Sequence, residues 1–148
     1  MPTLTPRPGQ RHPARGKIKP MSIRVEPSRI RQTVTVFDSG VLIGHHPDKG
    51  TRVFTVDPEF DDDGTARITG LHGTIVDALA RDPRVTIVWQ PRIRHGWSLI
   101  VDGSVRADSP RLIADAGDDA ALIINFVSGM LHRPGAHADG PEWEWPEA

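Results

Sequence analysis

The 148-residue chain contains no cysteine and no tyrosine. The lack of cysteine excludes disulfide bonds, thiolate nucleophiles and cysteine-bound metals. No uninterrupted apolar stretch approaches the ~18 residues of a membrane-spanning helix. The formal net charge of −1 gives the chain as a whole no attraction to nucleic acid. These absences predict a cytoplasmic protein without a membrane anchor, and they disfavour nucleic acid as a partner.

The two ends of the chain differ from its middle. Residues 1–20 hold five basic residues, five prolines and no acid, and residues 135–148 hold four acids without an aliphatic run. Neither end has enough apolar surface to offset the entropy cost of ordering. We therefore expect a basic disordered leader over 1–24, one domain over 25–134 and an acidic flexible tail over 135–148. The leader either precedes a true start at Met21 or contacts an acidic partner such as nucleic acid, and it has no apolar region typical of a secretory signal.

The middle of the chain predicts a mainly β domain with one short helix. Runs with strand character cover residues 40–44, 51–57, 65–69, 85–89, 97–105 and 120–127. Turns at 45–50 and 61–64 join the first three runs into an antiparallel meander. The almost continuously apolar run at 85–89 predicts burial on both faces. Gly103 marks a bulge or a close backbone approach in an alternating strand, and residues 107–119 are left as loop or weak strand.

A helix is predicted between the third and fourth of these strands, over Thr74–Arg81. Thr74 is the expected N-cap, and Pro83 stops the helix. Ile75, Val76 and Leu79 recur at helical spacing and would face a core. Free backbone N–H groups and the helix dipole attract anions at such an N-terminus. The strand, turn and helix therefore predict a site for a phosphate-bearing ligand.

The order of these elements resembles the pyridoxamine 5′-phosphate oxidase-like split barrels, which bind flavin mononucleotide (FMN). The similarity runs from about Gly40 to Val105, and a tail motif at 131–134 is similar to one in a small-protein branch of these flavin-fold proteins. The matching positions are Arg52, the acidic turn 61–64, Thr69, Thr74, Asp82-Pro83 and the valine-rich strand 85–89. The resemblance implies an antiparallel split β-barrel with one short helix between strands. It also implies a homodimer with the cofactor at its interface.

The resemblance further implies a flavin-dependent oxidoreductase acting on a small molecule, with the redox chemistry carried by the flavin. The candidate cofactor-binding residues are Arg52, Thr69, His72, Thr74, Trp89, Gln90, His132 and Arg133. No catalytic residue is identified. In the oxidases proper, two basic residues after the helix-opening serine grip the flavin phosphate, but here Ile75 and Val76 stand there. Three alternatives therefore stay open: the deazaflavin F420 as cofactor, a non-catalytic flavin- or deazaflavin-binding protein, and a cofactor-free dimeric barrel.

Other motifs do not predict chemistry. His45 and His46 are adjacent in a predicted turn, and no third ligand has the spacing of a metal site. The acidic turn 61–64 is similar to the start of a calcium loop, but His72 stands where the loop needs glutamate. No Ser-His-Asp arrangement or facing carboxylate pair is evident, which disfavours hydrolysis by a protein nucleophile. No metal is expected.

Overall fold

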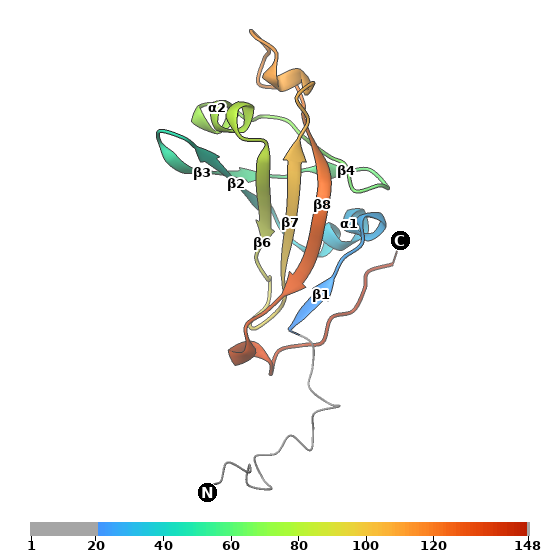
Figure 1. Cartoon of the computed structure of the whole chain (residues 1–148). Helices are drawn as coiled ribbons and strands as arrows, with labels where there is room; N and C mark the ends of the chain where they lie inside the picture. Colours follow the sequence, from blue (N-terminus) through green and yellow to red (C-terminus); the bar gives the residue numbers. More distant parts are fainter. Residues whose placement is uncertain (1–20, 148) are drawn as a thin grey trace, which may run out of the picture.

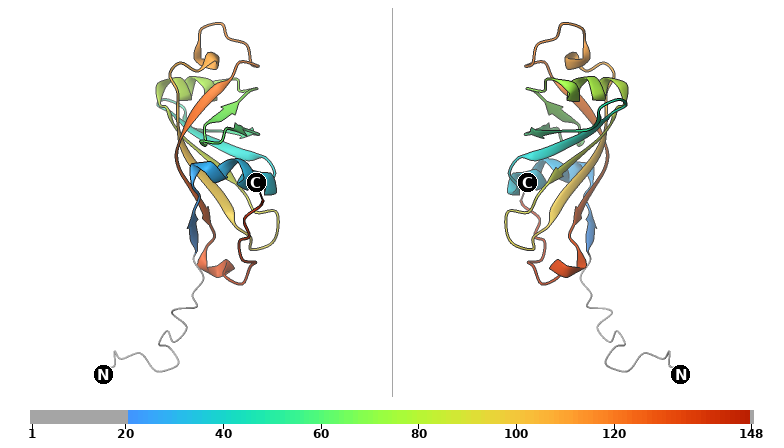
Figure 2. Two further views of the ribbon diagram at one scale, coloured as in Figure 1. Left: turned by 90° about the vertical axis from the view of Figure 1, so that its right-hand side faces the viewer. Right: turned by 90° about the vertical axis from the view of Figure 1, so that its left-hand side faces the viewer.

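A single strongly curled antiparallel sheet organises the protein, as the computed structural model of residues 21–147 shows (Figure 1). Its hydrogen-bonded strand order is β3-β2-β6-β7-β8-β5-β4, and β1 pairs with β8 beside this path. The side views show the sheet curling into an incomplete barrel, with α1 on its concave side (Figure 2). In chain order the elements are β1 (Ser22–Arg24), α1 (Pro27–Thr33), the 3-10 turn η3 (Val34–Val36), β2 (Gly40–His46), β3 (Gly50–Val56), β4 (Glu59–Phe60), β5 (Ala66–Ile68), α2 (Thr74–Arg81), β6 (Arg84–Trp89), β7 (Ser98–Val105), η4 (Pro110–Leu112), β8 (Leu122–His132) and η5 (Gly135–His137). The mainly β split barrel is confirmed, but α1 was not predicted.

The predicted meander is correct only for its first hairpin, in which β2 pairs with β3. The third strand, β5, pairs with β4 and β8 at the other end of the sheet order. Pro58 follows β3 and cannot donate a ladder hydrogen bond, so the chain leaves this edge and crosses to the far side of the barrel. The predicted acidic turn is confirmed there, because Asp61 N donates to the Thr65 carbonyl (2.9 Å) and Gly64 N donates to the Asp61 carbonyl (3.0 Å).

Strand β2 runs further than predicted, as far as His46. The His46 ring is buried, and its Nε2 lies 2.6 Å from the Asp77 carboxylate on α2. Its Nδ1 accepts hydrogen bonds from the backbone N–H groups of Asp48 and Lys49, both at 3.1 Å. This buried ring fixes the hairpin to α2 and shortens the predicted turn 45–50 to residues 47–49.

Strand β8 is also longer than predicted, and it extends past residue 127 to His132. Gly129 and Leu131 continue its buried face. Ser22–Arg24, which the sequence places in the basic leader, form β1 and pair with Met130–His132. The ordered domain therefore begins before residue 25, and the rest of the leader, residues 1–20, lies outside the described residues.

Helix α2 has the predicted bounds, Thr74–Arg81. The prediction of Thr74 as N-cap is wrong: Gly73, with φ of +80°, is the N-cap, and no side chain caps the helix. Gly44 allows the helix to pack directly on β2, since a Cβ at this position would lie 3.1 Å from Leu79 and 3.2 Å from Ile75. A side chain is thus excluded where helix and sheet meet.

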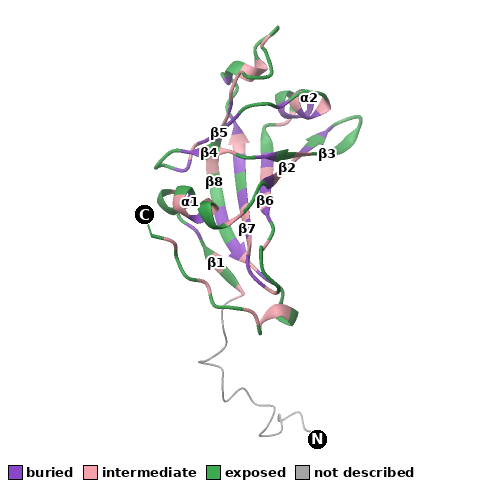
Figure 3. Cartoon of the chain, turned by 180° about the vertical axis from the view of Figure 1, so that it is seen from behind, coloured by how far each residue is buried: buried purple, intermediate pink, exposed green. Residues whose placement is uncertain are grey.

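The strands of the sheet bury one face and leave the other partly open (Figure 3). In β6, Val85, Ile87 and Trp89 are buried while the intervening residues are not, so the predicted burial on both faces is wrong for the single chain. The predicted alternation of β7 is confirmed. The register shifts between Asp102 and Gly103, but the extra residue of this bulge, Val127, lies on β8, and Gly103 makes the predicted close approach to the β8 backbone. The segment predicted as loop or weak strand contains η4 and turns.

The acidic C-terminal segment returns along the barrel past α1 (Figures 1 and 3). We call residues 134–147 the C-terminal strap. Trp143 of the strap stacks on Phe37, with ring centroids 6.1 Å apart, and Trp145 lies 4.5 Å from the Arg29 guanidinium. The strap thus has defined contacts, whereas its flexibility stays a prediction. None of the helices in residues 21–147 combines the length and apolarity that a membrane span requires.

The close backbone approach at Gly103 gives a stability prediction. A Cβ at this position would overlap the Ile124 side chain and lie 2.9 Å from the Asn125 carbonyl oxygen. Overpacking of this kind costs about 1–3 kcal/mol, so Gly103→Ala should lower the free energy of unfolding by that amount in urea denaturation. Gly135→Ala is the matched control, because a Cβ there meets nothing within 4 Å. Equal stability of the two variants would contradict the close packing described here.

Candidate functional site

The interior of the barrel offers no space for a ligand. Leu42, Leu99 and Leu131 are completely buried, and Trp89 is 2% exposed. These side chains fill the concave side of the sheet together with the rest of one continuous core. A cofactor of flavin size must therefore bind at the surface or between subunits.

Four of the predicted site residues lie at or beside one open corner, where β5 leads into α2. We call Thr69–Thr74 the β5–α2 corner. Thr69 and His72 are exposed there, and Thr74 is partly exposed at the start of the helix. Gly70 and Gly73 have φ values of +84° and +80°, and an added Cβ at either would meet nothing within 4 Å. The backbone of this corner is therefore open to an approaching ligand.

Arg52 lies beside this corner on β3. Arg52 and Phe54 share one face of the strand, and the Phe54 ring makes an edge contact with His72 at 5.2 Å between centroids. The Nη2 of Arg52 donates to the Lys49 carbonyl, while the Nε of Arg52 is buried without a hydrogen-bond partner. A buried donor without an acceptor costs about 1–3 kcal/mol. An oxyanion or hydroxyl of a ligand would satisfy it once the side chain turns toward the corner, and in that position the residues present fit the polar end of a flavin nucleotide.

The two residues that replace the family's basic pair belong to the core. Ile75 is 3% exposed and points at Gly44, and Val76 packs against the core cluster. Neither side chain carries a charge that could bind a phosphate. Any phosphate bound here would depend on backbone N–H groups, hydroxyls and Arg52.

Arg111 is a residue at this corner that the sequence did not indicate. Its Nε donates to the Leu71 carbonyl at 2.8 Å, and its Nη2 lies 3.3 Å from the Asp118 carboxylate. The Asp118 carbonyl in turn accepts from Gly70 N at 2.7 Å. The loop between β7 and β8 thus braces the corner. No local pattern could have revealed this, because 40 residues separate Arg111 from Leu71.

The other four predicted residues lie at the opposite end of the strands. Trp89 ends β6 within the core, which leaves little of its ring for a cofactor, and Gln90 follows it exposed. His132 ends β8, where its Nδ1 lies 3.1 Å from Ser22 Oγ. Arg133 is 1% exposed, with its guanidinium 4.2 Å from the centre of the Trp97 ring.

The two groups of predicted residues do not form one site within the chain. Strand β8 has 11 residues, and at roughly 3.3 Å per residue it spans about 35 Å. Helix α2 lies near the start of β8 (Figure 1), and His132 is the last residue of β8, at the opposite end of the strand. One ligand can contact both groups only if a second copy supplies one of them.

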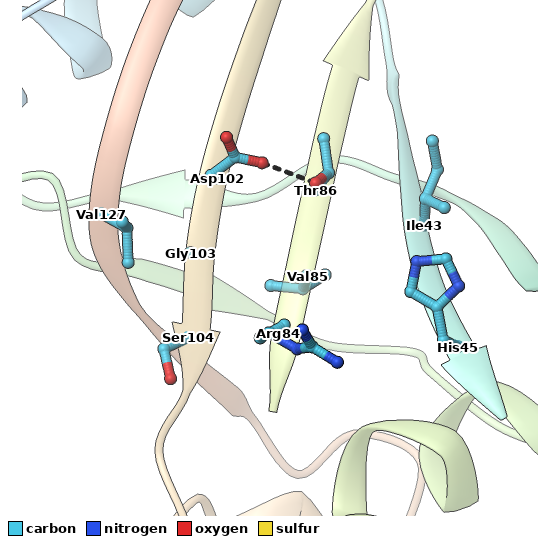
Figure 4. Close-up of a pocket in the computed structure, with 9 residues that line it drawn as sticks. All are labelled: Ile43, His45, Arg84, Val85, Thr86, Asp102, Gly103, Ser104 and Val127. Atoms are coloured by element: carbon cyan, nitrogen blue, oxygen red, sulfur yellow. Dashed lines mark hydrogen bonds between the residues drawn. The ribbon is translucent and has the colours of Figure 1, made fainter. Parts of the chain in front are cut away.

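A groove of about 650 Å³ crosses the convex face of the sheet. Its lining comes from β2, β6, β7 and β8, and consists of Ile43, His45, Arg84, Val85, Thr86, Asp102, Gly103, Ser104 and Val127 (Figure 4). Thr86 Oγ1 donates to the Asp102 carboxylate at 2.6 Å, and Ser128 Oγ does so at 3.3 Å. Polar groups in the groove are therefore held in place by their own neighbours.

The end of the groove nearest α2 carries an ion pair. Arg84 Nε and Nη2 donate to the two Asp82 carboxylate oxygens at 3.0 and 2.8 Å. These hydrogen bonds lower the pKa of the Asp82 carboxyl to about 2. Arg84 therefore keeps its partner ionised well into the acidic range.

The adjacent histidines point in different directions. His45 is exposed in the groove, whereas His46 is buried against α2. Across residues 21–147, no set of three or more His, Asp or Glu side chains is arranged to hold a metal ion.

No family model matches the sequence, and no curated protein matches it significantly. Solved structures do resemble the fold. An F420 reductase is 17% identical with a TM-score of 0.50, and the match covers 70% of this chain and 94% of that one. An FAD-binding protein from Mesorhizobium loti is 12% identical with a TM-score of 0.50, covering 76% of this chain and 99% of the other.

A candidate pyridoxamine 5′-phosphate oxidase from Lactobacillus delbrueckii is 11% identical, again with a TM-score of 0.50, and the match covers 67% of this chain and 88% of that one. Identities this low establish the fold alone. The resemblance read from the sequence is confirmed at that level. The chain has the fold of the pyridoxamine 5′-phosphate oxidase-like split barrels.

Proposed function

We propose that this protein binds a flavin-type cofactor, FMN or F420, with its phosphate end at the β5–α2 corner. The observation that carries the proposal is the buried, unpartnered Nε of Arg52 beside an exposed backbone with two positive-φ glycines. Thr69, His72 and Thr74 add side-chain donors to the free N–H groups at the start of α2. The similar folds of an F420 reductase and an FAD-binding protein support a cofactor of this class.

The cofactor would supply hydride transfer to or from a small substrate when bound. The chain's own residues would position it: Arg52 at the polar end, and His72 and Phe54 beside the corner. No side chain near the corner is assigned as an acid or base. The proposed activity is therefore that of an oxidoreductase in which the protein contributes binding and orientation.

A second candidate function is a barrel that binds a flavin without catalysis or binds no cofactor. The packing of Ile75 and Val76 in the core favours this second function, because the two basic residues that bind the flavin phosphate in the oxidases have no counterpart here. Each charge-assisted hydrogen bond that is lost costs about 1.5–3 kcal/mol. Weak binding would follow if backbone groups and Arg52 do not compensate.

We also propose that the protein is a homodimer that joins through the convex face of its sheet. The apolar residues on this face include Ile43, Val88, Ile100, Val127 and Met130. Val127 is 64% exposed and Met130 is 36% exposed, although both lie on a central strand. A second copy, related by a two-fold axis, would cover this face. It could also bring the His132 end of one subunit to the β5–α2 corner of the other.

The flavin proposal predicts the effect of changing Arg52. In calorimetric titration, Arg52→Gln should raise the Kd for FMN by about 10- to 100-fold, because a charge-assisted hydrogen bond is lost. The affinity for riboflavin, which lacks the phosphate, should change less. Arg67→Gln is the control, since Arg67 is an exposed arginine on β5.

Equal losses of FMN affinity in the Arg52→Gln and Arg67→Gln variants would show that Arg52 does not bind the phosphate. Mass spectrometry of small molecules released from the purified protein tests the proposal independently. If the wild-type protein carries no flavin and binds neither FMN nor F420, the protein is a cofactor-free barrel.

The dimer proposal predicts that charge on the convex face dissociates the protein. Val127→Asp should weaken self-association by at least about 100-fold, because burying an unpaired carboxylate costs several kcal/mol. Ile113→Asp is the matched control: Ile113 is 63% exposed and lies in the loop between β7 and β8, away from this face. Light scattering after gel filtration would measure the molecular mass, and so the self-association, of both variants. A wild-type monomer, or a dimer that survives Val127→Asp, would refute this interface.

A further inference from the structure

Arg133 is a buried cation without an acidic partner. It is 1% exposed, and none of the ion pairs among residues 21–147 includes it. Its Nη1 donates to the carbonyls of Pro141 (2.6 Å) and His95 (3.3 Å). Its Nε and Nη2 have no partner. These two N–H groups form the edge of a guanidinium that binds both oxygens of a carboxylate.

A cleft between the strap and the 91–96 loop is lined by Trp97 and Pro141, which both contact this guanidinium, although Arg133 itself does not line it. Its volume is about 440 Å³, which is within the range of small-molecule sites. Its aromatic walls are Phe37, Trp97 and Trp143. Trp97 also stacks on the Arg133 guanidinium, so one indole joins the apolar cleft to the buried charge.

The strap stands between the cleft and the unpartnered donors. Pro141 lines the cleft, and its carbonyl accepts from both Arg133 Nη1 and Trp97 Nε1, the latter at 3.1 Å. The unpartnered donors are shielded from solvent, so a ligand reaches them only when the strap shifts. The strap is held by the two hydrogen bonds to the Pro141 carbonyl, by Trp143 against Phe37, and by partly exposed contacts such as His95 Nδ1 to Asp139 at 2.7 Å. Local opening of a segment outside the sheet costs less free energy than global unfolding.

We propose that this cleft binds a small planar aromatic monocarboxylate, whose ring lies between the aromatic walls and whose carboxylate takes the Nε and Nη2 edge of Arg133. The mouth carries Glu144, and among the described lining residues the cation is Arg92, which lies 3.5 Å from Asp38. A ligand with a second negative charge would meet the Glu144 carboxylate. The site therefore selects against dicarboxylates and against phosphates, which separates it from the proposed flavin site.

The test uses the full-length protein and three probes: benzoate, the neutral benzamide and the dianionic phthalate. Quenching of tryptophan fluorescence would report binding, since two tryptophans line the cleft. Benzoate should bind at least about tenfold more tightly than benzamide because of the charge-assisted pair. Phthalate should bind more weakly than benzoate. Equal affinities for benzoate and benzamide, or no binding of benzoate at millimolar concentration, would overturn the proposal.

Two variants test the roles of Arg133 and the strap. Arg133→Lys keeps the charge and loses the paired N–H edge, so it should remove most of the preference for benzoate over benzamide. Arg92→Lys makes the same change at the mouth and should leave that preference unchanged. Equal effects of the two changes would contradict a role for Arg133.

Trp145→Ala gives a test that does not depend on the folding of the Arg133 variant. Trp145 holds the strap to Arg29 but does not line the cleft. Loosening the strap should raise the affinity for benzoate and speed proteolysis of the C-terminal segment. An unchanged or lower affinity would show that the strap does not gate the site. None of these outcomes depends on whether the protein binds flavin.

Discussion

The pairing of β8 with its neighbours is the constraint on which the rest of the structure depends. This one strand pairs with β7 along most of its length, with β5 near its start and with β1 at its end. The bulge opposite Asp102 and Gly103 bends the central pair, and an extra residue of this kind increases local twist. A sheet bent in this way encloses a core that side chains fill completely. Chemistry is consequently confined to the outside of the barrel.

The surface has two polar regions that the length of β8 keeps apart. At one end, the β5–α2 corner presents backbone donors and an arginine whose Nε lacks an acceptor. At the other end, Arg133 is buried under the strap with its charge uncompensated by any acid among the described residues. Both arginines have a buried donor without an acceptor, but their surroundings differ: Arg52 lies beside an open stretch of backbone, whereas Arg133 is enclosed by the chain's own C-terminal segment. This contrast is the reason that we assign them different ligands.

Local patterns in the sequence were sufficient for the elements that depend on neighbouring residues. The bounds of α2 follow from helical spacing and from Pro83, and the close backbone approach at Gly103 follows from a glycine within an alternating strand. The acidic turn was equally clear, because its hydrogen bonds close within five residues. The fold class could be predicted because the order of such local elements resembles a known barrel.

The errors concern contacts between distant parts of the chain. Strand β1 exists because Ser22–Arg24 find a partner in Met130–His132, more than 100 residues away. The pairing of β5 with β8 likewise could not be read from either strand. For the site, spacing placed Thr69, His72 and Thr74 together correctly, but it gave no sign of Arg111 or of the enclosure of Arg133. The N-cap was misassigned because Gly73, with positive φ, already starts the helix in a way that a threonine could not.

The position of β3 at the end of the strand order has a further consequence. Among the described residues, β3 pairs only with β2, so half of its backbone N–H and C=O groups face no strand. Such an edge can recruit an extended segment of another molecule, and charged residues commonly discourage this. Lys49 stands at the adjoining turn and Arg52 within the strand, while Val53, the residue after Arg52, is 62% exposed. The same arginine that we assign to cofactor binding therefore also protects the barrel against strand-to-strand aggregation.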